Sequence, residues 1–403
     1  MRADILQQID EGDIVDLASE LIRIPSFTGS ETPAAEFMRD FLGDNGFESE
    51  MQEVQPGRYQ VVARLRGTGE GRSMMFNGHL DIDPLTASWA WDPFEPRVEG
   101  NRLWGAGVHN MKSGVAAMTM AAIALKRSGL PLRGDLVVAC VVGELQGGLG
   151  TVHLVESGVR TDMAIVPEPY SVENIVTKSV GVHDFAINTL GRSEHISRME
   201  ESVDAIQKMR RVMERLDDMS FDVHDPDLPG APRWVVGSII GGRSREYDLA
   251  GPYNIPDVCT IIVDFRYPPG LTIEEINSRI VELLEDLKTE DPDFEYEFEY
   301  PVNSRFRVGG TAMPPMGVSP DAEVVRLLKE SHREITGSYP KRIGAVPPYS
   351  YCGNDTAHLE RAGIECCLYG PRGYPDEVEK HVRIDEMVCC CRSLALTAAK
   401  VCS

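Results

Sequence analysis

The sequence predicts an α/β protein with a mixed, mostly parallel sheet, helices on both faces, and an inserted ferredoxin-like α+β domain. Two observations predict the sheet. Residues 135–142 and 162–166 are apolar after an initial aspartate, which is typical of strands covered on both faces, and such stretches alternate with helical patterns. A third observation predicts the insertion, because the elements between residues 180 and 300 follow the order strand, helix, strand, strand, helix, strand.

The first part of the larger domain, residues 1–179, begins with two amphipathic helices. Residues 13–24 carry one apolar stripe and stop before Pro25, and residues 32–45 form a second helix that Gly46 closes. The following elements are predicted as strands over 59–66 and 73–81, a helix over 111–126, and strands over 135–142 and 162–166.

The insertion, residues 180–300, and the last part, residues 301–403, complete the prediction. In the insertion we expect strands over 181–190, 234–240, 258–265 and 294–300, and helices over 201–219 and 273–287. Beyond it we expect a helix over 322–337, a strand over 365–369 and a last helix over 387–401. Because helix and strand alternate again there, this last part should complete the first sheet.

Composition sets the broad class of the protein. A chain of 403 residues is too long for one hydrophobic core, and 42% hydrophobic residues suffice for two domains. Lys and Arg total 40 against 63 Asp and Glu, so the formal charge of −23 is spread along the chain. Such a surface repels nucleic acid and anionic membranes, and neither is an expected partner.

We expect a cytoplasmic protein. No window of about 18 apolar residues is present, and the first residues lack the basic and apolar regions of a signal peptide. The nine cysteines follow no disulfide-scaffold or zinc-finger spacing, and we interpret Cys389–Cys391 as packing residues of the last helix.

The run NGHLDIDP, residues 77–84, places a histidine and a carboxylate directly after a buried strand. His79 should emerge at the carboxyl end of that strand, where open α/β sheets bind their ligands. Asp81, two residues on, is placed to hold one imidazole nitrogen so that the other faces a metal ion. The alternative is an ordinary strand-end histidine.

Further polar residues fall at strand ends or in loops of the same frame. They are His109 and Asn110 before a helix, Glu144 and Glu168 after two strands, and His381 in a loop before the last helix. Histidines, carboxylates and a base together suit the binding of a divalent ion and the deprotonation of water. Singly, each has an ordinary explanation, such as a solvated strand end.

Five stretches, in this order, carry a family resemblance: GHLD, GAGVHNMKSG, GELQGGLGT, PEP and GPRGYPDEVEKHVRIDE. They resemble the M20 family of metallopeptidases and amidohydrolases, the group of carboxypeptidase G, acetylornithine deacetylase and aminoacylase. The resemblance covers nearly the whole chain and implies that the insertion is a lid through which two chains form a homodimer. It also implies hydrolysis of a carbon–nitrogen bond in a small carboxylate-bearing substrate, such as an N-acyl amino acid.

Carried over by position, the resemblance gives the residues of the larger domain their roles. His79 matches a metal ligand and Asp81 the acid that orients it. Glu144 matches the general base, Glu168 a carboxylate ligand, and His381 the ligand near the end of the chain.

The resemblance also assigns roles to three residues of the insertion. His195 matches the position that reaches the neighbouring subunit's site and stabilises the oxyanion, and Asn254 and Arg266 resemble positions that hold the substrate's carboxylate. A guanidinium suits this because it binds a carboxylate through two N–H groups. The alternative for Arg266 is a structural ion pair with Asp264 or another neighbour.

The sequence departs from the family pattern at two metal ligands. The aspartate that bridges two ions in the family is Asn110 here, and the glutamate that follows the base is Leu145. Because two negative charges are lost, we expect one divalent transition-metal ion, Zn2+ or Mn2+, bound by His79, Glu168 and the amide oxygen of Asn110. His109 is a candidate replacement for a lost ligand.

Three interpretations of function stay open at this point. In the first, the chain is a one-metal hydrolase with Glu144 as general base. In the second, the metal is lost and Glu144 serves directly as acid or base, for example in acyl transfer. In the third, the chain is a pseudoenzyme that binds a small carboxylate or regulates a partner.

Overall fold

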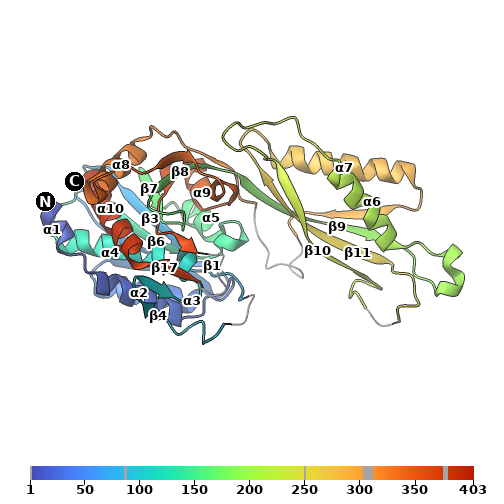
Figure 1. Cartoon of the computed structure of the whole chain (residues 1–403), viewed down its shortest axis with the longest axis horizontal. Coiled ribbons are helices and arrows are strands. Elements are labelled where there is room, and N and C mark those ends of the chain that lie inside the picture. The colour runs from blue at the N-terminus through green and yellow to red at the C-terminus, as the bar shows by residue number, and fades with distance from the viewer. Residues whose placement is uncertain (1, 86–88, 249–250, 303–311, 375–379) are drawn as a thin grey trace. The chain divides into compact units, whose positions relative to one another are not determined.

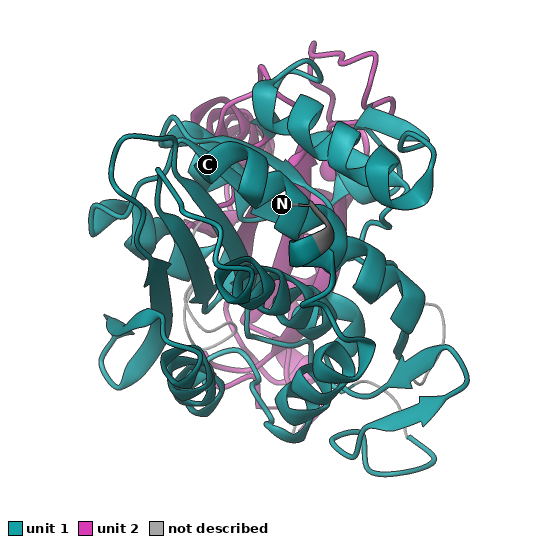
Figure 2. Cartoon of the chain, turned by 90° about the vertical axis from the view of Figure 1, so that its left-hand side faces the viewer, with its two compact units in different colours: residues 1–179, 316–403 teal, residues 180–315 magenta. Residues whose placement is uncertain are grey.

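The computed structural model of the protein describes residues 2–85, 89–248, 251–302, 312–374 and 380–403 (Figure 1). The chain forms two compact units, one of Met1–Ser179 with Met316–Ser403 and the other of Val180–Pro315 (Figure 2). We expected the insertion to begin at residue 180 and to end at residue 300. The second unit extends to Pro315, and residues 303–311 of this stretch lie outside the described residues.

The first unit is built on a nine-stranded sheet with the strand order β1-β2-β6-β3-β7-β15-β8-β13, and β14 pairs with β8. The four central strands, β6, β3, β7 and β15, run parallel to one another. The strands are β1 (Glu48–Gln55), β2 (Arg58–Leu65), β3 (Met74–His79), β6 (Leu136–Val141), β7 (Met163–Val166), β8 (Asn174–Ser179), β13 (Met316–Gly317), β14 (Arg342–Ala345) and β15 (Glu365–Leu368). This is the predicted mixed sheet with a parallel centre.

The helices of the first unit pack in three places. Helix α10 packs on α2, α4 and α8, and α2 packs on α4. Helix α3 packs on β1 and β2, and α5 and α9 pack on each other. The helices are α1 (Arg2–Leu6), α2 (Glu11–Arg23), α3 (Thr32–Asp44), α4 (Ser113–Arg127), α5 (Leu149–Glu156), α8 (Glu323–Thr336), α9 (Thr356–Arg361) and α10 (Ile384–Cys402). Every residue of β3, β6 and β7 is buried, as expected of strands covered on both faces.

A second, small sheet belongs to the same unit. Its order is β16-β17-β5-β4, with β16 (Gly373–Tyr374), β17 (His381–Arg383), β5 (Arg102–Trp104) and β4 (Arg97–Glu99). We expected His381 in a loop, and this was wrong, because His381 begins β17 and pairs with Trp104 of β5. Strands of two or three residues are too short to show an alternating pattern in the sequence.

The parallel strands of the large sheet bring several polar residues to one edge. β3 lies between β6 and β7 and is parallel to both, so the carboxyl ends of the three strands are neighbours. His79 is the last residue of β3, Glu144 follows β6, and Glu168 follows β7. This edge is therefore the place where the sequence predicts a site.

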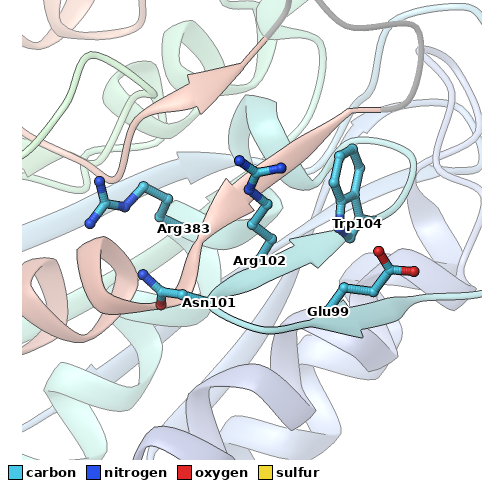
Figure 3. A pocket seen from close by; sticks show the side chains of 5 residues that line it. All are labelled: Glu99, Asn101, Arg102, Trp104 and Arg383. Atoms are coloured by element: carbon cyan, nitrogen blue, oxygen red, sulfur yellow. The ribbon is translucent and has the colours of Figure 1, made fainter.

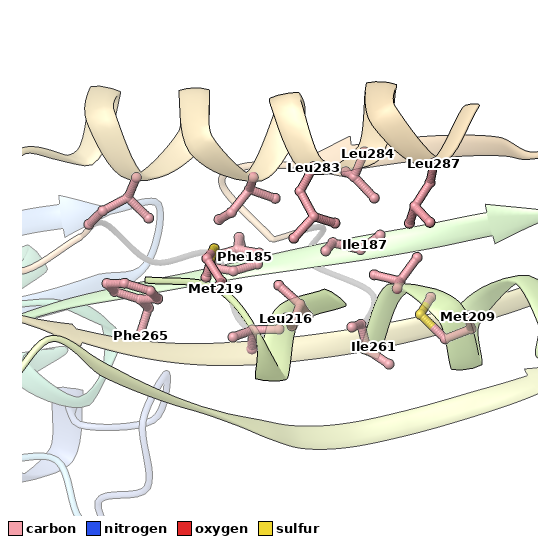
Figure 4. Close-up of a cluster of buried hydrophobic side chains, with 14 of the residues drawn as sticks. Phe185, Ile187, Met209, Leu216, Met219, Ile261, Phe265, Leu283, Leu284 and Leu287 are labelled. Carbon is pink, nitrogen blue, oxygen red and sulfur yellow. The ribbon is translucent and has the colours of Figure 1, made fainter. Parts of the chain in front are cut away.

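The second unit is the predicted insertion. It holds β9 (Gly181–Leu190), α6 (Ala205–Asp217), β10 (Arg233–Gly242), β11 (Val258–Tyr267), α7 (Ile273–Glu290) and β12 (Glu295–Glu299). The antiparallel sheet has the order β10-β11-β9-β12, which confirms the split βαβ plan. Its apolar core includes Phe185, Ile187 and Phe265 of the sheet, Leu216 of α6 and Leu284 of α7 (Figure 4). Among the helices that the structure describes, none is long and apolar enough to cross a membrane.

Candidate functional site

Five of the predicted site residues meet at the carboxyl ends of β3, β6 and β7. Around the His79 Nε2 atom lie Asn110 Oδ1 at 3.2 Å, Glu168 Oε1 at 3.7 Å and Glu144 Oε2 at 3.9 Å. His79 and Asp81 are fully buried, Glu168 is 2% exposed and Glu144 is 8% exposed. Such a concentration of buried carboxylates around one imidazole needs a cation or extra protons to neutralise it.

Asp81 holds both the imidazole and the predicted base. The His79 Nδ1 atom lies 2.9 Å from the backbone carbonyl oxygen of Asp81 and 3.5 Å from its carboxylate, so the carbonyl is the closer partner. The carboxylate instead accepts the backbone N–H groups of Glu144, at 3.2 Å, and of Leu145, at 3.0 Å. If Nδ1 donates to the carbonyl, Nε2 is left as the free acceptor that faces Asn110, Glu144 and Glu168.

The loop that carries Glu144 is packed tightly against α9. The Nε2 atom of His358 lies 2.7 Å from the backbone oxygen of Gly147. At Gly148, where φ is +79°, a Cβ atom would stand 2.5 Å from the ring of His358 and 2.8 Å from a carboxylate oxygen of Asp355. Only glycine therefore suits this position, and the close packing fixes the path of the chain after the predicted base.

Two carboxylates of this cluster, Glu144 and Glu168, hold protons more tightly than usual, whereas the pKa of Asp81 is lowered. Burial raises the pKa of Glu144 well above its ordinary value, and the charges of Glu168 and Asp355 add to this while His79 opposes it. Burial also raises the pKa of Glu168, again against the effect of His79. Burial lowers the pKa of His79, but Asp81, Glu168 and Glu144 outweigh it and raise that pKa overall.

The donor atoms around His79 Nε2 have spacings that suit the ligands of a metal ion. Ligands about 2.0–2.2 Å from a tetrahedral ion stand roughly 3.3–3.6 Å from one another, close to the separations found around His79 Nε2. The Oε1 atom of Glu168 is buried and has no hydrogen-bond partner among the described residues. No group of three or more His, Cys, Asp or Glu in the described ranges is arranged to hold an ion, and the amide oxygen of Asn110 is a further oxygen donor beside His79.

His381 and His109 lie in segments next to Asn110. Strands β16 and β17 pack beside the segment Val108–Lys112, and the buried imidazole of His381 lies against Trp104, with ring centroids 4.3 Å apart. His109 is buried with its Nε2 atom 4.0 Å from a carboxylate oxygen of Asp83. Burial, with Lys380 and His79, lowers the pKa of His109 to about 4, so this imidazole is neutral.

A cavity of about 350 Å³ opens beside the small sheet. Figure 3 shows its lining residues, which are Glu99, Asn101, Arg102, Trp104 and Arg383. Trp104 therefore contributes both to this cavity and to the packing of His381. Arg383 is already paired with Asp385.

The predicted residues of the insertion lie in the second unit. His195 is exposed, its Nδ1 atom is 2.9 Å from the hydroxyl of Ser197, and its backbone pairs with that of Asn254. Arg266 binds the carboxylate of Asp264 through two hydrogen bonds of 2.6 Å. The structure thus shows the ion pair that the sequence left open as the alternative for Arg266, and a role for Arg266 toward substrate stays a prediction.

Sequence reasoning missed other residues near the cluster. Asp355, in the stretch CGNDT before α9, is fully buried, and burial, with Glu168 and Asp81, raises its pKa to about 7. Tyr170, in PEPY, is 6% exposed and its pKa is raised well above the usual value, first by burial and then by Cys352, Glu168 and Glu144. The only sequence signal was the position of each residue, directly after a strand or directly before a helix.

Comparison with known proteins identifies related chains. The model of peptidase family M20/M25/M40 matches residues 75–400. The chain is 28% identical over 417 residues to N-formyl-4-amino-5-aminomethyl-2-methylpyrimidine deformylase of Halalkalibacterium halodurans, covering 96% of this chain and 94% of that protein. It is 25% identical over 383 residues to acetylornithine deacetylase of Myxococcus xanthus, covering 92% of both. The structure of an M20 family metallo-carboxypeptidase from Sulfolobus solfataricus has the same fold, with a TM-score of 0.76, 14% identity, and coverage of 97% of this chain and 99% of that one.

Proposed function

The chain belongs to peptidase family M20/M25/M40 and is an enzyme that hydrolyses carbon–nitrogen bonds of small substrates, and from this premise we propose that it removes a short acyl group from a small amine. The observation that carries the proposal is the buried carboxylate of Glu144 beside His79 and Glu168. Relatives named as a deformylase and a deacetylase support a formyl or acetyl group as the part removed.

We propose that one divalent transition-metal ion, Zn2+ or Mn2+, is bound by His79, Glu168 and the amide oxygen of Asn110. His381, on the strand beside the segment of Asn110, is the fourth candidate ligand. When bound, such an ion polarises the carbonyl of the scissile bond and makes a neighbouring water more acidic. The separations of 3.2 and 3.7 Å from His79 Nε2 support the first three ligands.

In this proposal Glu144 moves the proton. Its carboxylate takes a proton from the attacking water and passes it to the leaving nitrogen. Burial raises the pKa of Glu144, which suits a group that must hold a proton between these two steps. The carboxylate of Asp81 accepts the backbone N–H of Glu144, and the backbone carbonyl of Asp81 faces His79. Asp81 therefore orients both groups without touching substrate.

The insertion supplies the remaining expected groups. We propose that His195 of a second copy of the chain stabilises the oxyanion, as the family resemblance implies, and that Asn254 and Arg266 hold a carboxylate on substrates that carry one. Arg266 can do so only if it leaves Asp264 or binds both carboxylates. A homodimer through this unit is supported by β10, an edge strand that exposes Val235 and Ile239 by 59% and 55% of their surface.

The proposal is tested by measuring metal content and hydrolysis on the same sample. Elemental mass spectrometry before and after chelation is combined with assays of N-formyl amines, N-acetyl amino acids and dipeptides. We expect about one ion per chain, loss of activity on chelation, and recovery on adding Zn2+ or Mn2+. Hydrolysis that survives complete removal of metal would instead establish direct chemistry at Glu144, the second interpretation.

A further inference from the structure

A stacked pair of tyrosines lies directly beside the predicted ligand Glu168. Tyr170 is two residues further along the chain, and its backbone N–H donates to the carbonyl of Glu168 at 2.7 Å. Its ring stacks on that of Tyr349, with centroids 5.1 Å apart and planes 21° from parallel. Because Tyr349 belongs to a distant stretch of chain, Tyr349–Tyr351 after β14, the fold brings two rings together at this point.

The backbone around Tyr170 is held in an uncommon conformation. Ser171 has a φ of +73°, a region that a residue with a side chain seldom adopts. The side-chain amide of Asn174 donates to the carbonyl of Tyr170 at 2.7 Å and stabilises this turn. Strain of this kind is typically kept where it serves a site, because elsewhere a relaxed turn would be more stable.

The surroundings of Tyr170 connect the buried carboxylates to the surface. Burial raises the pKa of Tyr170, the charges of Cys352, Glu168 and Glu144 add to this, and the side chain of Cys352 is a hydrogen-bond partner of the Tyr170 hydroxyl. Cys352 is exposed, whereas the other eight cysteines are buried or, for Cys389, half-buried. Tyr349 is also partly exposed. Tyr170 is thus buried beside Glu168, and its two partners, Tyr349 and Cys352, reach solvent.

We propose that Tyr170, Tyr349 and Cys352 form an aromatic wall that receives a planar aromatic or heteroaromatic ring on the amine part of the substrate. Stacked tyrosine rings favour another flat ring, since offset stacking adds to the burial of apolar surface. The phenol and thiol groups supply polar contacts to a ring nitrogen. The inference rests on the proposed function, because it assumes that the acyl group of the substrate lies next to Glu144 while the ring of its amine part lies at the tyrosines.

The first test uses Cys352 as a reporter and needs no turnover. A thiol reagent applied to the native protein should modify one cysteine quickly, and Cys352→Ser should abolish this reaction. Benzylamine and 5-(aminomethyl)pyrimidine, which resemble a released product, should slow the modification, and butylamine at the same concentration should not. Equal protection by all three amines, or protection by none, would overturn the aromatic wall.

A pair of tyrosine variants separates ring recognition from general damage. Tyr349→Leu should raise the amine concentration needed for half protection about tenfold, the effect of one lost ring stack. Tyr339→Leu is the control, because Tyr339 is an exposed tyrosine of the same unit that contacts Lys329 and Arg333. If both variants keep wild-type protection, the wall is wrong. Should Tyr349→Leu fail to fold, the comparison of amines on the wild-type protein still decides.

Hydrolysis assays distinguish failure of the wall from failure of the proposed function. Protection by ring-bearing amines without hydrolysis of any N-acyl amine would support the wall and contradict the proposed reaction. Hydrolysis of N-formylbenzylamine and N-formylbutylamine with equal KM would support the reaction and contradict the wall.

Discussion

The carboxylate of Asp81 accepts the backbone N–H of Glu144 at 3.2 Å, so the residue that presents its carbonyl to the predicted metal ligand also holds the predicted base. The two groups stand at the ends of neighbouring parallel strands, β3 and β6, and their spacing is set by the sheet. A displacement of either strand therefore moves ligand and base together. The predictions below separate the contributions of these parts.

Replacing Glu144 with Gln should lower kcat by about 100-fold to 10,000-fold and leave ligand binding unchanged, because the amide keeps the shape but cannot take a proton. Steady-state kinetics and protection of Cys352 by amines measure the two effects separately. Glu156→Gln is the matched control, since Glu156 is an exposed glutamate of the following helix. A Glu144→Gln enzyme that keeps most of its rate would show that another group is the base.

Replacing Asn110 with Asp should raise the metal content from about one ion per chain toward two, because it restores a carboxylate next to His79 and Glu168. Asn110→Ala should bind metal more weakly than the wild-type chain. Elemental mass spectrometry after dialysis against limiting Zn2+ measures both. An unchanged metal content in both variants would mean that residue 110 does not contact the ion.

Replacing Asp264 with Asn should release Arg266 and lower the KM for N-acetyl amino acids by about tenfold, the effect of one charge-assisted hydrogen bond. The KM for an N-formyl amine without a carboxylate should not change. Arg266→Ala should raise only the first of these KM values. If neither variant discriminates between the two substrates, the pair of Asp264 and Arg266 is purely structural.

Replacing Lys112 with Met should lower the free energy of unfolding by about 1–3 kcal/mol, because one buried and one partly buried carbonyl oxygen lose their partner. The Lys112 ammonium donates to the carbonyls of Leu21 and Ile24, at the end of α2, at 2.7 and 2.8 Å. Lys126→Met is the control, since Lys126 is half-buried and makes the same kind of contact at the end of α3. Urea denaturation should show the larger loss at Lys112, where water cannot replace the ammonium.

His332 should make stability depend on pH below about 6.5, the pKa of an unfolded histidine. Burial lowers the pKa of His332, although Glu173 opposes this, and its Nδ1 atom lies 2.8 Å from the Tyr369 hydroxyl. The unfolded chain then binds more protons than the folded one, so the free energy of unfolding falls as pH drops below about 6.5 and is constant above it. Urea denaturation of the wild type and His332→Gln at pH values between about 5 and 7 should show the weaker dependence in the variant.

Several parts of the fold were predictable from the sequence because their patterns are local. The apolar run at 135–142 and the helix at 273–287 correspond to β6 and α7, and the order of elements in the insertion is confirmed. The approach of His79, Glu144 and Glu168 was predictable too, because each follows a parallel strand and such strands end at a common edge.

Other parts depend on contacts between distant segments and leave no local pattern. The contact of Tyr349 with Tyr170 joins the segment after β14 to the segment after β7, and the contact of His381 with Trp104 accompanies the pairing of β17 with β5. The sequence predicted the pairing of Arg266 with Asp264 only as an alternative. Both residues lie on one strand, and their spacing does not tell whether Arg266 binds Asp264 or the carboxylate of a substrate. Such choices are made by tertiary packing.

The contact of Lys112 with the end of α2 has a practical consequence for preparing the protein. Lys112 stands two positions after the predicted ligand Asn110. The carbonyl oxygens that bind Lys112, and so anchor this segment, lie at the end of α2, the first long helix of the chain. A shortened clone that begins after α2 would lose this anchor and loosen the segment far along the sequence. Low metal occupancy in such a clone would report on the cloning boundary and would say nothing about the native enzyme.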